Sequence, residues 1–113
     1  AYHRAIALAA EVATIARTPP YEDQPNRRSQ LERAAESIYA NIAEGSASGR
    51  NRNYARFVQY AIASSSELEG HLAFALRIRA ITAEAHTALS EETIEVRKML
   101  IGLKKHLLRT PDE

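Results

Sequence analysis

Cysteine does not occur in this sequence of 113 residues, which excludes disulfides, thiolate metal sites and cysteine nucleophiles. Long hydrophobic runs are also missing, since no apolar stretch approaches the roughly 18 residues that a membrane-spanning helix needs. Arg4 and Glu11 interrupt the alanine-rich start of the chain, and no small-residue cleavage pattern follows, so this segment predicts a helix rather than a signal peptide. We therefore expect a soluble, cytoplasmic protein with no membrane partner.

The chain also carries almost no net charge. Its 15 lysines and arginines against 14 aspartates and glutamates give a formal net charge of +1, which is too small to attract nucleic acid or membrane by bulk charge alone. Any electrostatic function must therefore depend on where the charges lie. The length is typical of one domain of roughly 100 to 200 residues, so residues 1–113 are predicted to form a single domain.

Proline and glycine, four of each, are few and gathered in two main places. Three prolines lie within residues 18–26, and Gly45 and Gly49 bracket a second break. Between these breaks the apolar residues recur at helical rather than strand spacing, and the many alanines, leucines, glutamates and arginines favour helix. The pattern predicts helices over about 2–17, 26–44, 51–79 and 83–109. We expect an all-α fold, an antiparallel up-down four-helix bundle.

Two helix boundaries carry a specific signal. Gly45 is predicted to end the second helix in the left-handed conformation that glycine adopts without strain, and Thr82 to cap the N-terminus of the fourth. The fourth helix has a heptad series at His86, Leu89, Thr93, Val96, Leu100, Leu103 and Leu107. Its second apolar edge consists of Ile94, Met99, Ile101 and Leu108. Either self-association or one wide buried face accounts for that edge.

Two motifs carry a family resemblance. Residues 37–45 read S-I-Y-A-N-I-A-E-G, residues 54–58 read Y-A-R-F-V, and residues 64–69 read S-S-S-E-L-E. They resemble the four-helix-bundle family of S23, or 23S rRNA intervening-sequence, proteins, whose pattern is S-I-x-A-N-I-A-E-G, a turn, and F-x-R-F-L-x-x-A-x-G-S-x-x-E-L. Further similar segments, residues 2–5, 29–34 and 97–103, extend the likeness over nearly the whole chain. The departures lie at helix-start and packing positions: Tyr39, Arg50, Asn53 and Ala63 stand where the family usually has Pro, Ser, Glu and Gly.

The resemblance implies a ring-shaped homopentamer with a central channel. Relatives include proteins encoded inside insertions of large-subunit ribosomal RNA genes. Another branch is the accessory protein of diversity-generating retroelements, a basic pentamer that binds nucleic acid and a reverse transcriptase. No activity is established for most members. The shared motif marks Asn41, Glu44, Gly45 and Glu67 as structural positions.

Glu44 lies in the last turn of its predicted helix, where the helix dipole disfavours an exposed carboxylate by about 0.3 to 1 kcal/mol. Because the following link is short, we expect compensation from the N-terminus of the next helix, or from Arg50 or Arg52. Asn41, one turn earlier, can hydrogen-bond the same turn. A structural clasp is favoured over a catalytic carboxylate, since no partner acid, histidine or nucleophile accompanies Glu44 in the sequence.

The patterns of an enzyme or a metal site are missing. A di-iron bundle needs two Glu-x-x-His pairs and two further glutamates, whereas Glu67 and His71 are four positions apart and no second such pair exists. The serines of residues 64–66 lack the glycine-flanked elbow of a nucleophile, and residues 45–49 lack the lysine and the preceding strand of a phosphate-binding loop. We expect no catalytic residue, no metal and no cofactor.

Basic residues are the strongest candidates for a binding site, and 12 of the 15 are arginine, whose planar fork suits phosphate. The predicted nucleic-acid contacts are Arg50, Arg52, Arg56, Arg27 and Arg28. The late bases of the fourth helix are Arg97, Lys98, Lys104, Lys105 and Arg109. For these late bases, complementarity to the helix dipole is the favoured explanation. The bases at the start of the third helix lie at the wrong end for the dipole, so binding and solvation both stay open there.

The sequence therefore predicts a non-enzymatic, self-assembling helical bundle, a homopentamer by resemblance, that binds RNA or DNA, with ribosomal RNA among the candidates. A ring would repeat a weak arginine cluster and strengthen its hold on phosphates. The alternative is an adaptor or scaffold that binds a protein partner and no nucleic acid, which the near-neutral charge favours.

Overall fold

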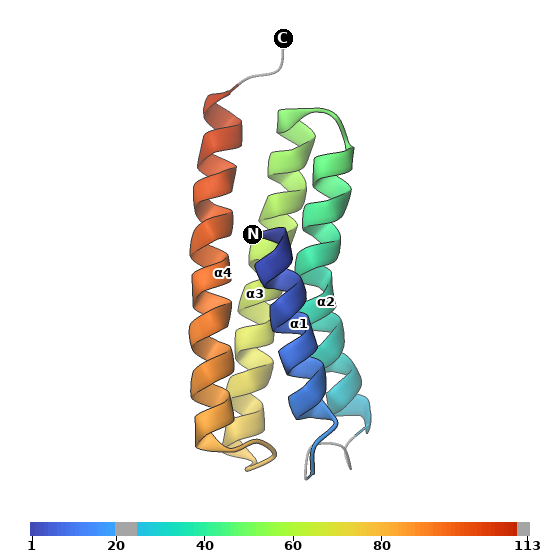
Figure 1. Ribbon diagram of the computed structural model, residues 1–113, viewed down its shortest axis with the longest axis vertical. Helices are drawn as coiled ribbons and strands as arrows, with labels where there is room; N and C mark the ends of the chain where they lie inside the picture. The colour runs from blue at the N-terminus through green and yellow to red at the C-terminus, as the bar shows by residue number, and fades with distance from the viewer. Residues whose placement is uncertain (20–24, 111–113) are drawn as a thin grey trace.

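Four helices account for nearly all of the chain that the structure describes, residues 1–19 and 25–110. In this computed structural model they are α1 (Tyr2–Ala16), α2 (Pro25–Ala47), α3 (Asn51–Arg77) and α4 (Ala83–Arg109). Successive helices run in opposite directions and stand side by side along one long axis (Figure 1). The prediction of an all-α, up-down four-helix bundle is confirmed.

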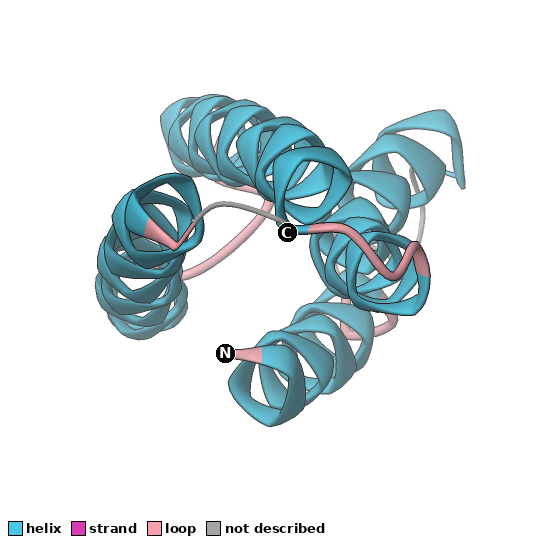
Figure 2. Cartoon of the chain, turned by 90° about the horizontal axis from the view of Figure 1, so that it is seen from above, coloured by secondary structure: helices cyan, strands magenta, loops and turns pink. Residues whose placement is uncertain are grey.

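Each helix packs against two neighbours around a common axis. α2 contacts α1 and α3, α4 contacts α3 and α1, and neither diagonal pair of helices is in contact. Figure 2 shows this arrangement from above, with the helices around a centre rather than in one layer. The molecule is a rod with principal extents of 52 × 21 × 19 Å.

α1 is the short member of the bundle and covers only part of its length. Its 15 residues rise about 22 Å, whereas the 27 residues of α3 or α4 rise about 40 Å. The N-terminus accordingly lies midway along the rod (Figure 1). Arg4, in the first turn of α1, reaches Glu92 and Met99 of α4. The structure therefore has a four-helix half and a three-helix half, the latter formed by residues 38–47, 51–64 and 100–109.

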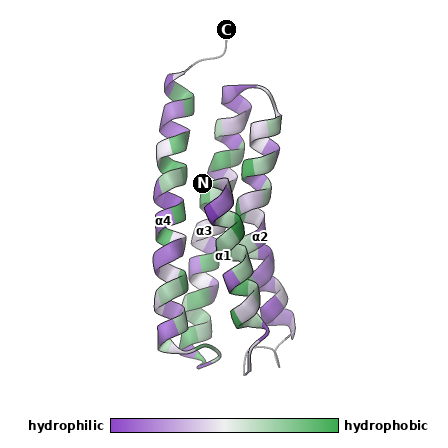
Figure 3. Cartoon of the chain, in the orientation of Figure 1, coloured by the Kyte–Doolittle hydropathy of each residue, from purple (hydrophilic) through white to green (hydrophobic). Residues whose placement is uncertain are grey.

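The core follows the helical spacing of the apolar residues. α1 buries residues at steps of three and four along one face: Ala5, Leu8, Val12 and Ala16. In α4 the predicted heptad faces inward, with Leu89, Thr93, Val96, Leu100 and Leu107 buried. The buried hydroxyl of Thr93 donates to the carbonyl of Leu89 at 2.7 Å, so its polar atom is satisfied within the helix. Figure 3 shows hydrophobic residues through most of α1 and hydrophilic ones at the start of α2.

The predicted role of Gly45 as the end of the second helix is wrong. α2 continues through it to Ala47, and Gly45 is buried. A Cβ atom at this position would lie 2.8 Å from the Cβ of Phe57 and 3.2 Å from the carbonyl oxygen of Tyr54. The glycine is therefore needed for the close approach of α2 to α3. The left-handed residue of this turn is Gly49, at φ +79°.

The start of α4 confirms a local prediction. The backbone N–H of Ala85 donates to the Thr82 hydroxyl at 3.1 Å, which is the expected N-cap. α3 ends at Arg77, two residues before the predicted limit, and the chain reverses through Arg79 at φ 60°. This left-handed conformation is uncommon for a residue other than glycine.

Candidate nucleic-acid interface

The five predicted arginines do not form one surface. Arg27 and Arg28 lie in the first turn of α2, whereas Arg50, Arg52 and Arg56 lie at the start of α3. Because the 23 residues of α2 rise about 35 Å between these places, the two groups occupy opposite ends of the bundle. The guanidinium carbon of Arg27 lies 4.7 Å from the ring centroid of Phe74, near the end of α3. The five residues therefore form two separate groups on the subunit, and their prediction as nucleic-acid contacts stays a prediction.

The end of α4 meets the start of α3. The side-chain amide of Asn51 donates to the carbonyl oxygen of Thr110 at 2.5 Å. The ammonium group of Lys104 donates to Oε1 of Gln59 at 2.7 Å. These contacts place the arginines at the start of α3 and the bases near the end of α4 at the same end of the rod, although about 50 residues separate them in the sequence.

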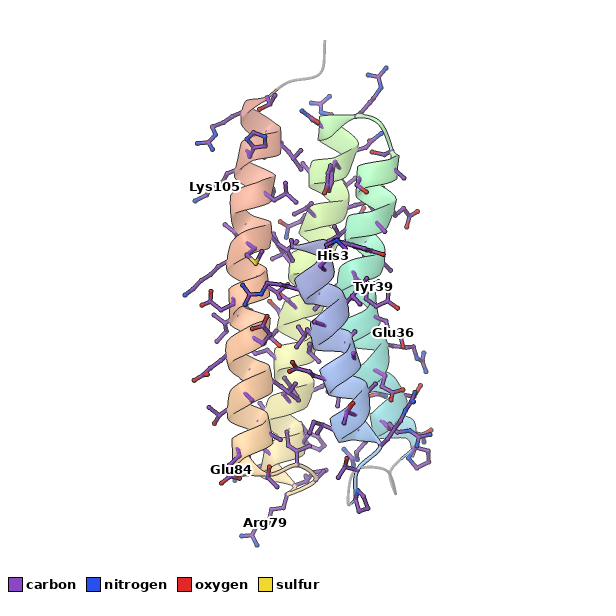
Figure 4. All side chains as sticks on the ribbon, in the orientation of Figure 1. His3, Glu36, Tyr39, Arg79, Glu84 and Lys105 are labelled. Carbon is purple, nitrogen blue, oxygen red and sulfur yellow. The ribbon has the colours of Figure 1, made fainter. Side chains whose placement is uncertain are left out.

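We call this region the basic end and define it by six residues: Arg50, Arg52, Arg56, Lys104, Lys105 and Arg109. Figure 4 shows Lys105 toward the C-terminal end of α4, while Arg79 and Glu84 lie at the other end of the bundle. Arg50, Arg56, Lys105 and Arg109 are exposed. In the sequence, the bases of α3 and those of α4 are separate clusters. Only the antiparallel pairing of α3 with α4 brings them together.

The basic end also lacks acidic residues in the two segments that form it. Residues 45–66 and 96–110 contain no aspartate or glutamate. Two further bases of α4 lie next to acids just outside these segments, since Arg97 forms an ion pair with Glu69 and Lys98 lies 3.5 Å from Glu95. Among the residues that the structure describes, Glu44, in the last turn of α2, is the acid that lies toward this end. The positive charge is therefore concentrated, although the whole chain is nearly neutral.

In the four-helix half, ion pairs join α1 to its two neighbouring helices. Arg4 forms two hydrogen bonds of 2.9 Å with the carboxylate of Glu92, and Arg17 lies 3.3 Å from Glu32. The hydrogen bond to Glu92 and the negative charge of that carboxylate raise the pKa of Arg4 above the ordinary value for arginine. These pairs join α1 to α4 and to α2, and they reduce the field that this half presents to an anion.

The expected clasp at Glu44 is not formed. Glu44 is exposed and makes no hydrogen bond or ion pair with any residue that the structure describes. Asn41 does not bond the last turn of α2 but donates to the carbonyl of Ser37 at 2.8 Å and to its hydroxyl at 3.1 Å. The Ser37 hydroxyl lies 2.7 Å from that of Ser64. The motif residue Asn41 therefore supports a polar link between α2 and α3 one turn earlier than predicted.

Glu67 borders an open groove of about 700 Å³ between α2 and α3, together with Arg33, Ser37 and His71. The Glu67 carboxylate lies 3.5 Å from Nε2 of His71, and its side chain is largely exposed. Within residues 1–19 and 25–110, no three potential metal ligands lie close enough to hold an ion. None of the helices described is long and apolar enough to cross a membrane.

Comparison with solved structures supports the fold. The chain is similar to the crystal structure of a protein of unknown function from the S23 ribosomal protein family of Bacteroides thetaiotaomicron VPI-5482, with a TM-score of 0.84. The two sequences are 20% identical, and the alignment covers 92% of this chain and 97% of the other. At this identity the likeness establishes the shared bundle only.

A comparison with protein families identifies the family to which the chain is related. No functionally curated protein matches the chain. Residues 1–102 match the family described as 23S rRNA-intervening sequence protein, which is nine-tenths of the sequence. The chain therefore belongs to the 23S rRNA-intervening sequence protein family.

Proposed function

We propose that this protein is a non-enzymatic, self-assembling bundle that binds nucleic acid through its basic end. The observation that carries the proposal is the meeting of two acid-free segments, residues 45–66 and 96–110, at one end of the rod. Their six cations lie where helix pairing concentrates them. A polyanion therefore meets a local field much stronger than the net charge of +1 indicates.

Binding of this kind depends on phosphate rather than on base sequence. Each phosphate that a lysine or arginine neutralises releases condensed counterions, so affinity falls steeply with salt. Arginine supplies four of the six residues of the basic end, and its planar guanidinium can hold two phosphate oxygens at once. Six cations on one monomer are few, so a single copy is expected to bind weakly at physiological salt.

Self-assembly would multiply that weak site. The family resemblance implies a homopentameric ring, and the structure supports association with exposed apolar side chains on α4, where Ile101 is 40% and Leu108 is 60% exposed. Ile94, partly buried, continues the same stripe at seven-residue spacing. A ring repeats the basic end once per subunit, which raises the effective affinity for a long polyanion without any new contact.

The test is fluorescence anisotropy of labelled RNA and DNA of mixed sequence, from about 50 to 200 mM salt. We expect salt-dependent, sequence-tolerant binding. Changing Arg50, Arg52 and Arg56 to Ala should weaken it strongly and reduce the slope of log K against log salt by up to about 3. Light scattering on the same samples reports the oligomeric state and checks the pentamer.

A matched variant removes the same charge from the other end of the bundle. It changes Arg28, Arg77 and Arg79 to Ala and should leave nucleic-acid affinity within about twofold, apart from long-range charge effects that salt screens. Undetectable binding at low salt, or equal losses in the two triple variants, contradicts the proposal.

The protein-adaptor alternative rests on the exposed stripe of Ile101 and Leu108. If this stripe binds a different protein, a pull-down should recover one partner that resists both nuclease and high salt. Leu108→Asn, which adds no charge to the basic end, should abolish that capture without changing nucleic-acid affinity. Loss of the oligomer in Leu108→Asn would instead assign the stripe to self-assembly.

A further inference from the structure

The outer face of α3 combines arginine with an exposed aromatic side chain. Arg52, Arg56 and Tyr60 follow one another at four-residue spacing, so they lie on one face at steps of about 6 Å. All three are exposed, and 47% of Tyr60 is accessible to solvent. A large aromatic ring beside cations, within an acid-free segment, is the combination that proteins use to hold single strands.

Tyr60 is held in place by a neighbouring ring. The rings of Phe57 and Tyr60 meet edge to face, with centroids 5.6 Å apart and planes at 88°. The guanidinium carbon of Arg56 lies 5.4 Å from the centroid of the half-buried Phe57. Arg56, Phe57 and Tyr60 thus form a continuous row of planar groups anchored on the α2–α3 packing. Such anchoring reduces the entropy lost when a ligand stacks on the exposed ring.

Lysines of α4 extend this surface. Lys104 donates to Gln59, which lies three residues after Arg56 and so neighbours it on the helix surface; the second acid-free segment therefore borders the arginines of this face. A strand whose phosphates contact Arg52 and Arg56 then has Tyr60 on one side for its bases and the lysines of α4 on the other for its backbone. Double-stranded nucleic acid offers the same phosphates, but its bases are stacked on each other and expose no free face to the tyrosine.

A second exposed aromatic side chain on α3, Phe74, provides a comparison for Tyr60. Phe74 is 49% exposed and lies 14 residues after Tyr60 on the same outer face. One face of its ring is covered by Arg27, and Glu67 and Glu69 separate it from the basic end. Phe74 therefore matches Tyr60 in exposure and in having an arginine nearby, but not in its electrostatic surroundings.

We propose that the site formed by Arg52, Arg56 and Tyr60 selects single-stranded over double-stranded nucleic acid, by stacking an unpaired base on Tyr60 while the arginines hold its phosphates. This inference rests on the proposed function and adds the form of nucleic acid that the basic end prefers. Base identity matters little in this mode, because every base has a π-face.

The experiment measures binding of the full chain to a labelled oligouridylate of about 12 nucleotides and to an RNA duplex of equal length, at one salt concentration. Wild type should bind the single strand more tightly. Tyr60→Ala should weaken single-strand binding by about fivefold or more, the effect of losing one base–aromatic stack. It should leave duplex affinity and the salt slope unchanged, because no charge is removed.

Two control variants separate stacking from other effects. Tyr60→Phe keeps a ring and should retain single-strand affinity within about twofold. Phe74→Ala removes the comparison ring and should leave both single-strand and duplex affinity unchanged. Circular dichroism and light scattering confirm that each variant keeps the fold and the mass of the wild type. A Tyr60→Ala variant that loses its assembly overturns the inference, because it places Tyr60 in a subunit contact.

The outcomes distinguish this inference from the proposed function. If Tyr60→Ala binds the single strand like wild type, or if the duplex binds more tightly than the single strand, the stacking site is wrong. In both cases a loss on changing Arg50, Arg52 and Arg56 to Ala still supports nucleic-acid binding by charge. If neither RNA binds at low salt, both proposals fail.

Discussion

The two halves of the bundle differ in both cover and charge. In the four-helix half, α1 closes the gap between α2 and α4, and ion pairs such as Arg4–Glu92 neutralise some of the charges. In the three-helix half, α1 is missing, and the segments of α3 and α4 contain arginine and lysine without acids. The difference shows that cover by α1 and an excess of positive charge occur at opposite ends of the bundle, and the proposed function assigns binding to the basic end.

The largest expected effect concerns α1, whose packing should make truncations in the four-helix half cost more unfolding free energy than truncations in the three-helix half. Leu8 of α1 is fully buried in the four-helix half, and Leu8→Ala should lower the free energy of unfolding by about 3 kcal/mol. Leu107, 6% exposed in the three-helix half, has neighbours on fewer sides, so Leu107→Ala should cost about half as much. Urea denaturation at fixed protein concentration measures both, and equal losses would contradict the comparison.

A smaller effect concerns how the three-helix half is held together without α1. Gly45→Ala places a methyl group 2.8 Å from Phe57 and should destabilise the fold by about 1 to 3 kcal/mol. The matched change is Gly102→Ala, on α4, where nothing lies within 4 Å of the added carbon. It should stabilise the protein by up to about 1 kcal/mol through helix propensity. Thermal unfolding followed by circular dichroism distinguishes the two signs, and stabilisation by Gly45→Ala would show that α2 does not need this close approach.

The smallest effect concerns the Arg4–Glu92 ion pair that joins α1 to α4. Arg4→Ala should lower the free energy of unfolding less than either packing change, since the pair is at the surface, and the effect should shrink at high salt. A double-mutant cycle with Glu92→Gln isolates the pair. Because the pKa of Arg4 is raised, its contribution is complete below the ordinary arginine pKa and is lost only as the pH rises through the folded value. The coupling should therefore be constant between about pH 7 and 10, and a decline in that range would contradict this assignment.

Much of the bundle could be predicted because helices are local. The burial of Leu89, Val96 and Leu100 and the cap at Thr82 depend on residues a few positions apart. The role of Gly45 was wrong, because a glycine before a turn predicts a left-handed end whereas here it makes room for Phe57 of the next helix. The clasp expected at Glu44 likewise depended on the orientation of α3 relative to α2.

The candidate site shows where local reasoning ends. Arg50, Arg52 and Arg56 are recognisable as a cluster from the sequence, whereas the distance of the other two predicted contacts, Arg27 and Arg28, from this cluster depends on the length of α2. Conversely, Lys104, Lys105 and Arg109 were attributed mainly to the helix dipole. Their place beside the start of α3 rests on contacts such as Asn51–Thr110, which join residues 59 positions apart.

The sequence by itself determined that this chain forms four amphipathic helices and that its charges are balanced in number but not in position. Periodicity and capping act within a few residues, so they need no knowledge of the fold. Only the tertiary structure decided that the short α1 leaves half of the rod with three helices, and that the two acid-free segments meet there. Electrostatic fields depend on distances in space rather than along the chain, so the concentrated positive surface forms only when the helices are packed.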